Sequence, residues 1–261
     1  MKDIKLLPAI LLSIVFVSCD KDDDNYTPAP VIQATVIKAS GDSSAIVAKL
    51  NEFRILAGDP LNNAPGATAG RREVNWDGVP ANFTNANNFP FDFFGSADPA
   101  LGNGRKRGLI MTNTGTSFRV DSTDFSDIDA SYTNQFEAFS RKRLFAYMGN
   151  NVTEVTFKVP GTNTDAFVKG FAVIFSDVDQ VNSTSVEYFN GAKSLGLFTA
   201  TPAAQGFSLV GASFSQEKVT RVKITAGNGL LAAGVKDVSD GGAKDLVVMD
   251  DFLYDEPTSN N

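Results

Sequence analysis

Hydrophobic positions alternate with polar positions along much of the chain, a pattern typical of half-buried β-strands. The clearest case is 153–159, where Val155, Phe157 and Val159 fall on one face. The run 168–175 is almost continuously apolar, as expected for a strand that is buried on both faces. Further strand signals lie at 72–76, 108–112, 117–121, 185–189, 194–199, 207–214, 219–225 and 245–254.

One segment near the N-terminus has helical periodicity instead. Asp42 or Ser43 can cap its start, and Gly58 follows as a stop signal. Between them, four apolar residues recur on one helical face: Ile46, Leu50, Phe53 and Ala57. The sequence therefore predicts a single short helix ahead of the strands.

The spacing of strands and turns indicates the fold class. Asn190-Gly191 lies between two strand-like runs and is a strong hairpin signal, because both residues tolerate positive φ. Many short strands joined by glycine-rich turns are typical of sandwiches and barrels. We expect a mainly β protein, an antiparallel β-sandwich with a short N-terminal helix. A single domain spans 42–257, and a tail covers 258–261.

The N-terminus reads as an export signal. Lys2 and Lys5 precede an apolar run at 6–17, which is too short to span a bilayer and suits a signal peptide at 1–18. Ser18-Cys19 resembles the lipobox of bacterial lipoproteins, and this resemblance implies cleavage before Cys19 and acylation of its thiol. The alternative is an ordinary secretory signal followed by an incidental cysteine.

An acidic stretch follows the cysteine. Residues 20–25 read DKDDDN and form a solvated, self-repelling tether, which we extend over 19–41. The stretch also resembles the export signal of surface lipoproteins of Bacteroidota. That resemblance implies an outer-membrane lipoprotein that faces outward and is held by its lipid. A plain acidic spacer has the same composition.

Two absences limit the chemistry. The 261 residues include no histidine and one cysteine, so His-based triads, His-ligated metals and intramolecular disulfides are excluded. The formal net charge of −7 argues against nucleic acid as a partner. Oxygen ligands remain available, and these suit Ca²⁺ before Mg²⁺.

Six segments carry a wider resemblance: GRREVNWDGVP at 70–80, RLF at 143–145, TEVTF at 153–157, IFSDVD at 174–179, RVKIT at 221–225 and LVVMDDF at 246–252. With these segments the chain resembles secreted bacterial proteins of uncertain function, many of which carry PEP-CTERM sorting signals. The second half also looks like a galactose-binding-type jelly roll, the fold of many carbohydrate-binding modules. This likeness implies a fold and only weakly a ligand.

Four aspartates are candidate calcium ligands. Asp177 and Asp179 end the apolar run, and residues two apart on a strand point to the same side. Asp250 or Asp251 on the last strand could complete a cation site made of oxygens. The alternative is that Asp177 and Asp179 cap a turn through backbone amides. Neither 177–182 nor 237–242 has EF-hand spacing.

The candidate ligand site centres on Trp76, the single tryptophan. With Asn75 and Asp77 beside it, an exposed ring could stack on a sugar while the polar groups bind hydroxyls. A lone tryptophan in a sandwich is more often part of the core. The basic clusters at 105–107 and 141–143 could bind anionic glycans or could be solvated loops.

The leading hypothesis is a non-catalytic cell-surface β-sandwich that binds a glycan or another extracellular ligand, with Ca²⁺ as a stabilising ion. A structural or adhesion component of the envelope or extracellular matrix is the alternative. A carboxylate-based hydrolase is a further one, with its acids drawn from Glu73, Asp77, Glu137, Glu154 and Glu187.

Overall fold

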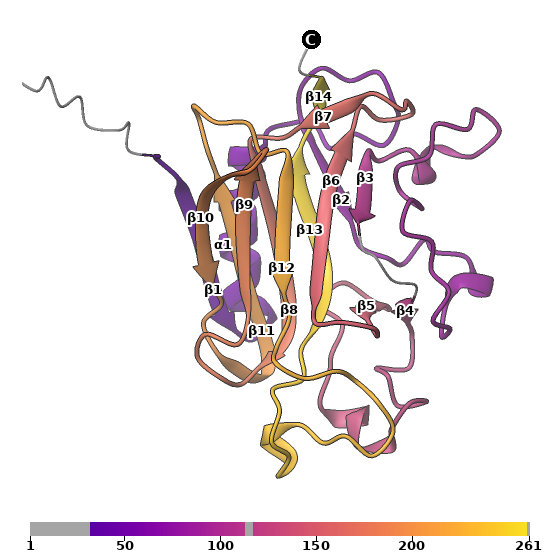
Figure 1. The fold of residues 1–261 in the computed structure, drawn as a ribbon, viewed down its shortest axis with the longest axis vertical. Helices are drawn as coiled ribbons and strands as arrows, with labels where there is room; N and C mark the ends of the chain where they lie inside the picture. The colour runs from indigo at the N-terminus through magenta and orange to yellow at the C-terminus, as the bar shows by residue number, and fades with distance from the viewer. Residues whose placement is uncertain (1–31, 113–116, 260–261) are drawn as a thin grey trace, which may run out of the picture. The chain divides into compact units, whose positions relative to one another are not determined.

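The computed structural model describes residues 32–112 and 117–259, which form two antiparallel β-sheets with one α-helix. Figure 1 shows the second sheet in front of the first, with the helix behind both. The mainly β, antiparallel sandwich architecture predicted from the sequence is confirmed. The signal peptide, Cys19 and the acidic stretch lie outside the described residues.

The first sheet has seven strands in the order β1-β11-β8-β13-β5-β4, and β2 pairs with β13. The strands are β1 (Thr35–Gly41), β2 (Arg71–Val74), β4 (Phe118–Asp121), β5 (Leu144–Tyr147), β8 (Gly170–Val178), β11 (Ala203–Ser213) and β13 (Val248–Asp255). The central strand β8 pairs with both β11 and β13.

The second sheet also has seven strands, in the order β10-β9-β12-β6-β7-β14, and β3 pairs with β6. They are β3 (Leu109–Thr112), β6 (Val152–Lys158), β7 (Asp165–Phe167), β9 (Ser185–Asn190), β10 (Lys193–Thr199), β12 (Arg221–Thr225) and β14 (Thr258–Ser259). The hairpin predicted at Asn190-Gly191 is confirmed: it joins β9 to β10, and Gly191 has φ 57°.

Strand β8 is buried along its whole length because both of its faces are covered. Phe171, Val173 and Phe175 belong to the main core between the sheets. Ala172 and Ile174 belong to a second core on the opposite face, under the helix. This double burial accounts for the continuous apolar run in the sequence.

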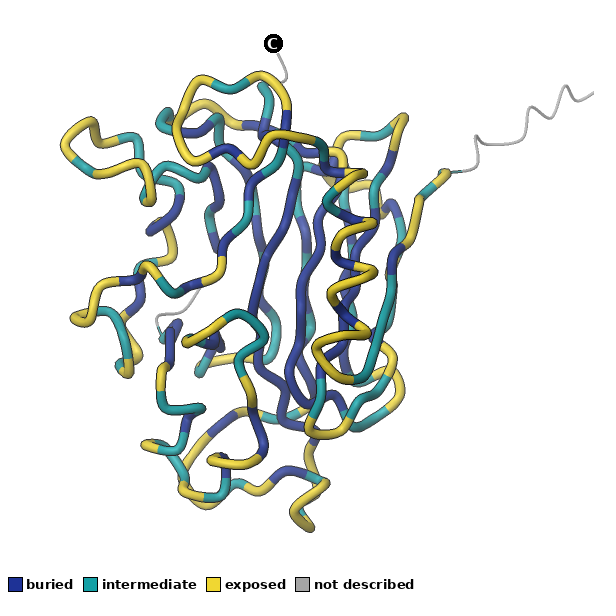
Figure 2. The backbone as a smooth tube through the Cα atoms, turned by 180° about the vertical axis from the view of Figure 1, so that it is seen from behind, coloured by how far each residue is buried: buried dark blue, intermediate teal, exposed yellow. Residues whose placement is uncertain are grey.

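The helix α1 (Ser43–Ala57) covers the outer face of the first sheet, as Figure 2 shows from behind. Asp42 caps it, with its Oδ1 accepting a hydrogen bond from the Ala45 amide at 3.0 Å, and Gly58 ends it. Its buried residues are the four predicted from the periodicity: Ile46, Leu50, Phe53 and Ala57.

The predicted boundaries need two corrections. Residues 35–41, expected to be part of the tether, form β1, which pairs with β11 over all seven residues. Residues 258–259, expected to be tail, form β14 beside β7. The folded unit thus begins earlier and ends later than 42–257. In both places the pairing partner is far away in the sequence.

Long connections with little regular structure complete the domain. Four 3₁₀ turns lie in them: η1 (Ala81–Phe83), η2 (Asn103–Arg105), η3 (Ala130–Asn134) and η4 (Val238–Asp240). The segment 122–140 places Phe125, Tyr132 and Phe136 in a third hydrophobic cluster with Leu246 and Val248. In the described residues, no helix is long and apolar enough to cross a membrane.

Candidate functional site

The structure buries Trp76, which exposes 1% of its surface. Its ring stacks on Phe145, with centroids 4.2 Å apart and an interplanar angle of 5°, and its Nε1 donates to the Asp250 carbonyl at 2.8 Å. The ring is therefore part of the core, and its face is not free to stack on a sugar. This corrects the ligand-binding expectation in favour of its alternative.

A cavity of about 280 Å³ nevertheless lies beside this tryptophan. Its walls come from the end of β2 and the residues after it, from Phe93 and Phe94, and from the segment 102–107. Asn75 and Trp76 line it, whereas Asp77 does not, and the Asp77 carboxylate accepts a hydrogen bond from the Lys142 amide. The structure thus places two of the three expected ligand-binding residues at one cavity.

The charged residues of the cavity are Arg105, Arg107 and Glu73. Burial lowers the pKa of both arginines, and a guanidinium group stays protonated in proteins. Glu73 is held by Arg54 at 2.8 Å and by Arg71 at 2.8 Å, and these two arginines keep its pKa low against the opposing effect of burial. Because the charge of Glu73 is balanced by its ion pairs with Arg54 and Arg71, the net charge that the cavity presents is positive.

Arg105 is held in a fixed orientation at the cavity. Its Nε donates to the Phe93 carbonyl at 2.8 Å, and its guanidinium carbon lies 3.7 Å from the centre of the Phe93 ring. The lining also includes small residues: a Cβ added at Gly78, Gly102 or Gly104 would meet nothing within 4 Å. These glycines keep the cavity open beside a pre-positioned cation.

A second group of functional residues is acidic. The carboxylates of Asp177, Asp179 and Asp237 each place an oxygen within 4.8 Å of the others. Asp177 lies in β8, Asp179 directly follows it, and Asp237 caps the 3₁₀ turn η4. We call these three residues the acidic triad.

Asp250 and Asp251 do not join the acidic triad, which corrects half of the calcium site expected from the sequence. In the β8–β13 register Val248 lies opposite Ser176, so Asp250 and Asp251 lie farther along β13, away from Asp177. Asp237 takes their place in the group. Its Asp-x-Ser cap is visible in the sequence, but its proximity to β8 is not.

Hydrogen bonds hold the acidic triad in place. Asp177 Oδ1 accepts from the Gln205 amide at 2.7 Å. Asp237 Oδ1 accepts from the Ser239 amide at 2.8 Å, and its Oδ2 accepts from the Leu246 amide at 2.7 Å. The carboxylates therefore belong to rigid backbone positions.

A neighbouring carboxylate fixes the turn that carries Asp179. Asp245 accepts hydrogen bonds from the amides of Asp179 and Gln180, at 3.2 and 3.0 Å, and from the Ser183 hydroxyl. Burial raises the pKa of Asp177 to about 6. Burial, contact with the Asp237 carboxyl and the surrounding negative charges raise the pKa of Asp179 to about 7.

Asp250 and Asp251 form a separate buried pair. They occupy a β-bulge in β13, where the register with β8 shifts between Met249 and Phe252. Asp250 Oδ2 accepts from the Phe139 amide at 2.6 Å, and the Ser140 hydroxyl donates to Asp251 at 2.6 Å. The pair anchors the 139–140 loop to the sheet.

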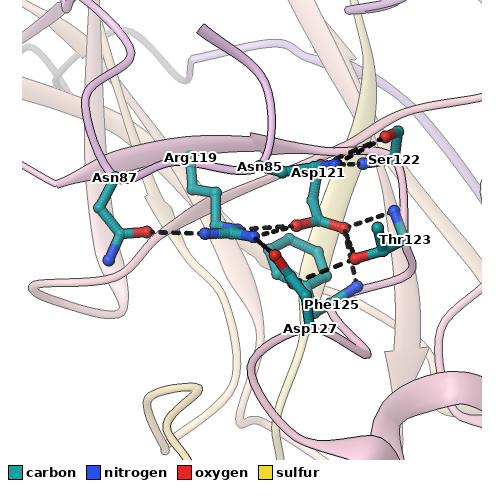
Figure 3. Close-up of polar contacts among 8 residues, drawn as sticks. All are labelled: Asn85, Asn87, Arg119, Asp121, Ser122, Thr123, Phe125 and Asp127. Atoms are coloured by element: carbon teal, nitrogen blue, oxygen red, sulfur yellow. Dashed lines mark hydrogen bonds and ion pairs between the residues drawn. The ribbon is translucent and has the colours of Figure 1, made fainter. Parts of the chain in front are cut away.

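A third polar cluster surrounds Arg119 on β4 (Figure 3). Arg119 donates to Asp121 at 2.7 Å and to the Asp127 carboxylate. The other Asp121 oxygen accepts from the Thr123 and Phe125 amides at 2.7 and 2.9 Å. Because these buried groups are satisfied by the protein itself, the cluster is structural.

The acids considered for hydrolysis are dispersed over several elements. Glu154 of β6 pairs with Arg221 of β12 at 2.7 Å, and Glu187 of β9 accepts from the Ser194 hydroxyl at 2.8 Å. Glu73 is bound by its two arginines. Each of these three acids thus has a polar partner, and Glu137 is exposed to solvent.

No protein-family model matches the sequence, no curated protein shows significant similarity to it, and no solved structure matches its fold.

Proposed function

We propose that the protein is an outer-membrane lipoprotein that faces outward and whose β-sandwich binds an extracellular glycan bearing acidic groups. The observation that carries the proposal is the cavity beside Trp76, with two arginines and a neutralised acid in its lining. The membrane part of the proposal rests on the sequence around Cys19.

The chemistry of the lining suits an acidic sugar. A guanidinium group offers paired donors to a carboxylate or sulfate, and such charge-assisted hydrogen bonds are stronger than neutral ones. Asn75 adds an amide that can bind a hydroxyl as donor or acceptor. The apolar faces of a sugar ring would lie against Phe93 and Phe94.

The size of the cavity favours a small recognition unit. Ligand pockets usually enclose roughly 300–1,000 Å³, and the 280 Å³ here lies at the lower end of that range. We therefore expect one acidic sugar residue, or the end of a longer chain, to enter it. Gly102 and Gly104 leave the space into which such a unit would fit.

The test is a binding screen of the full chain in detergent against uronic acids, sulfated glycans and their neutral counterparts. The best acidic ligand is then titrated against Arg105→Gln. Loss of one charge-assisted hydrogen bond weakens binding by about tenfold or more. Gly104→Leu fills the cavity without touching the core and should abolish binding.

Arg141→Gln is the matched control, because it removes the same charge from an exposed residue that is not part of the cavity lining. Its affinity should equal that of the wild type. Equal loss in Arg141→Gln and Arg105→Gln would show that binding depends only on overall charge, and would reject the cavity. Absence of any glycan ligand would favour the structural or adhesion alternative.

A further inference from the structure

Buried polar atoms without partners are concentrated at one place in the described residues. In the part of the chain that the structure describes, five buried side-chain nitrogen or oxygen atoms lack a hydrogen-bond partner. Three of them are carboxylate oxygens of the acidic triad: Asp177 Oδ2 and both oxygens of Asp179. A fourth, Gln135 Nε2, belongs to a side chain that contacts Asp177. Unsatisfied groups of this kind usually indicate a missing ligand, water or ion.

Hydrogen bonds within the protein do not explain these oxygens. Asp177 is fully buried, with 0% exposure, yet its Oδ2 accepts no hydrogen bond, although the Gln135 side chain lies close to this carboxylate. Within residues 32–112 and 117–259, none of the ion pairs identified involves one of the three carboxylates. A buried charge without a counter-charge is costly, and a cation bound from solution would supply that counter-charge.

We infer that Asp177, Asp179 and Asp237 form a divalent-cation site of the calcium type. The unpartnered oxygens of Asp177 and Asp179 point to the ion, while Asp237 uses the remaining lone pairs of oxygens that already accept backbone hydrogen bonds. Rotating the Gln135 amide by half a turn presents a further oxygen, since the two amide atoms are interchangeable in position.

The donor set selects the ion. All of the ligand atoms are oxygens, whereas zinc and copper prefer sites with nitrogen or sulfur ligands. Ca²⁺ takes six to eight oxygens in irregular geometry, and three carboxylates binding through one or two oxygens each, one amide and water can supply them. Mg²⁺ demands a regular octahedron and retains most of its water, which suits this compact carboxylate group less well.

The ion also has a structural role. Asp177 lies near the end of β8 in the first sheet, and Asp237 caps η4 in the connection from β12 to β13. Bridging them joins the sheet to the 226–247 segment, which otherwise has little regular structure. The site lies away from the cavity lining, so its effect is on stability and does not depend on the proposed glycan function.

The experiment compares thermal unfolding of the full chain in EDTA and in millimolar CaCl₂, with MgCl₂ as a second probe. An ion that binds only the native state raises the melting temperature, by about 5 °C or more at a hundredfold excess over Kd. Calorimetric titration with CaCl₂ should give one site per chain.

Asp179→Asn is the decisive variant, because it keeps the shape of the side chain and removes one ligand charge. It should fold in EDTA at least as well as the wild type and lose the Ca²⁺-dependent shift. Asp240→Asn is the matched control, since Asp240 lies on the same loop but is exposed and pairs with Lys236. It should retain the full shift.

Three results would overturn the inference. One is the absence of a Ca²⁺-dependent shift and of titration heat in the wild type. Another is a shift of unchanged size in Asp179→Asn, which would place the ion elsewhere. The third is an equal shift with Mg²⁺ at equal concentration, which would reject the calcium-type geometry.

Discussion

Two buried aspartates of this protein lie in surroundings that disfavour the ionised carboxylate and so raise its pKa. Asp250 is fully buried and adjoins Asp251, which is 4% exposed. Burial raises the pKa of Asp250 well above its ordinary value, and the charge of Asp251 and the hydrogen bond between the two groups add to the rise. Burial also raises the pKa of Asp251. The pair therefore retains a proton at pH values where free aspartates are ionised.

This proton makes the stability of the folded protein depend on pH. The native pair binds a proton that the unfolded chain releases above about pH 4, so its contribution to stability falls as the pH rises. Asp250→Asn supplies a permanently neutral group that can still accept from the Phe139 amide. We expect the melting temperature of the variant, relative to the wild type, to increase steadily from pH 4 to pH 8. A difference that is independent of pH would contradict the shared proton.

At the scale of elements, short strands in this fold depend on side chains to hold the loops that follow them. β4 has four residues, and the turn after it is organised by Asp121, which binds Arg119, Thr123 and Phe125. Arg119 in turn reaches Asn87 at 3.3 Å in the 75–108 segment. One ion pair therefore connects a strand, a turn and a distant loop.

Removing the centre of this cluster should be costly. Asp121→Ala removes one carboxylate partner of the buried Arg119 and leaves the Thr123 and Phe125 amides without their acceptor. We expect the unfolding free energy to fall by about 3 kcal/mol. Asp127→Ala removes a partner of the same arginine that is 38% exposed, so about 1 kcal/mol or less is expected. Chemical denaturation measures both. Similar losses in the two variants would show that burial does not set the strength of the cluster.

The elements that local patterns specify were predicted well. The α1 helix carries its cap, apolar face and stop within 17 residues, and the β9–β10 hairpin has its turn signal between the strands. The strands β1, β5, β7 and β14 were missed because they are short or edge strands, and β1 and β14 pair with partners distant in sequence. β1, for example, pairs with residues 207–213.

The same distinction between local and distant information explains which residues of the candidate sites could be predicted from the sequence and which could not. The sequence indicated Asp177 and Asp179, which adjoin on one strand end, and the basic cluster that contains Arg105 and Arg107. It did not indicate Asp237, nor that the β8–β13 register places Asp250 and Asp251 away from Asp177. Trp76 was ambiguous in sequence, because burial of a single ring depends on packing partners such as Phe145.

At the scale of the whole molecule, the proposed anchor determines where the protein resides in the cell. Cys19→Ala removes the only thiol that a lipid could modify. We expect the variant to leave the membrane fraction and to partition into the aqueous phase of a detergent extraction. Cys19→Ser is the closest control for side-chain size and should behave in the same way. Membrane retention of both variants would reject lipid anchoring at this residue.

The position of β1 has a mechanical consequence. It is the first strand after the proposed tether, and its seven residue pairs with β11 connect that tether to the sheet. Tension between the membrane and a ligand in the cavity would therefore enter the domain through β1. A pull along the strand axis loads its backbone hydrogen bonds together in shear, whereas a pull across the sheet would break them one after another. If the domain is anchored as proposed, the pairing of this edge strand would therefore be the first part of the fold to bear the load.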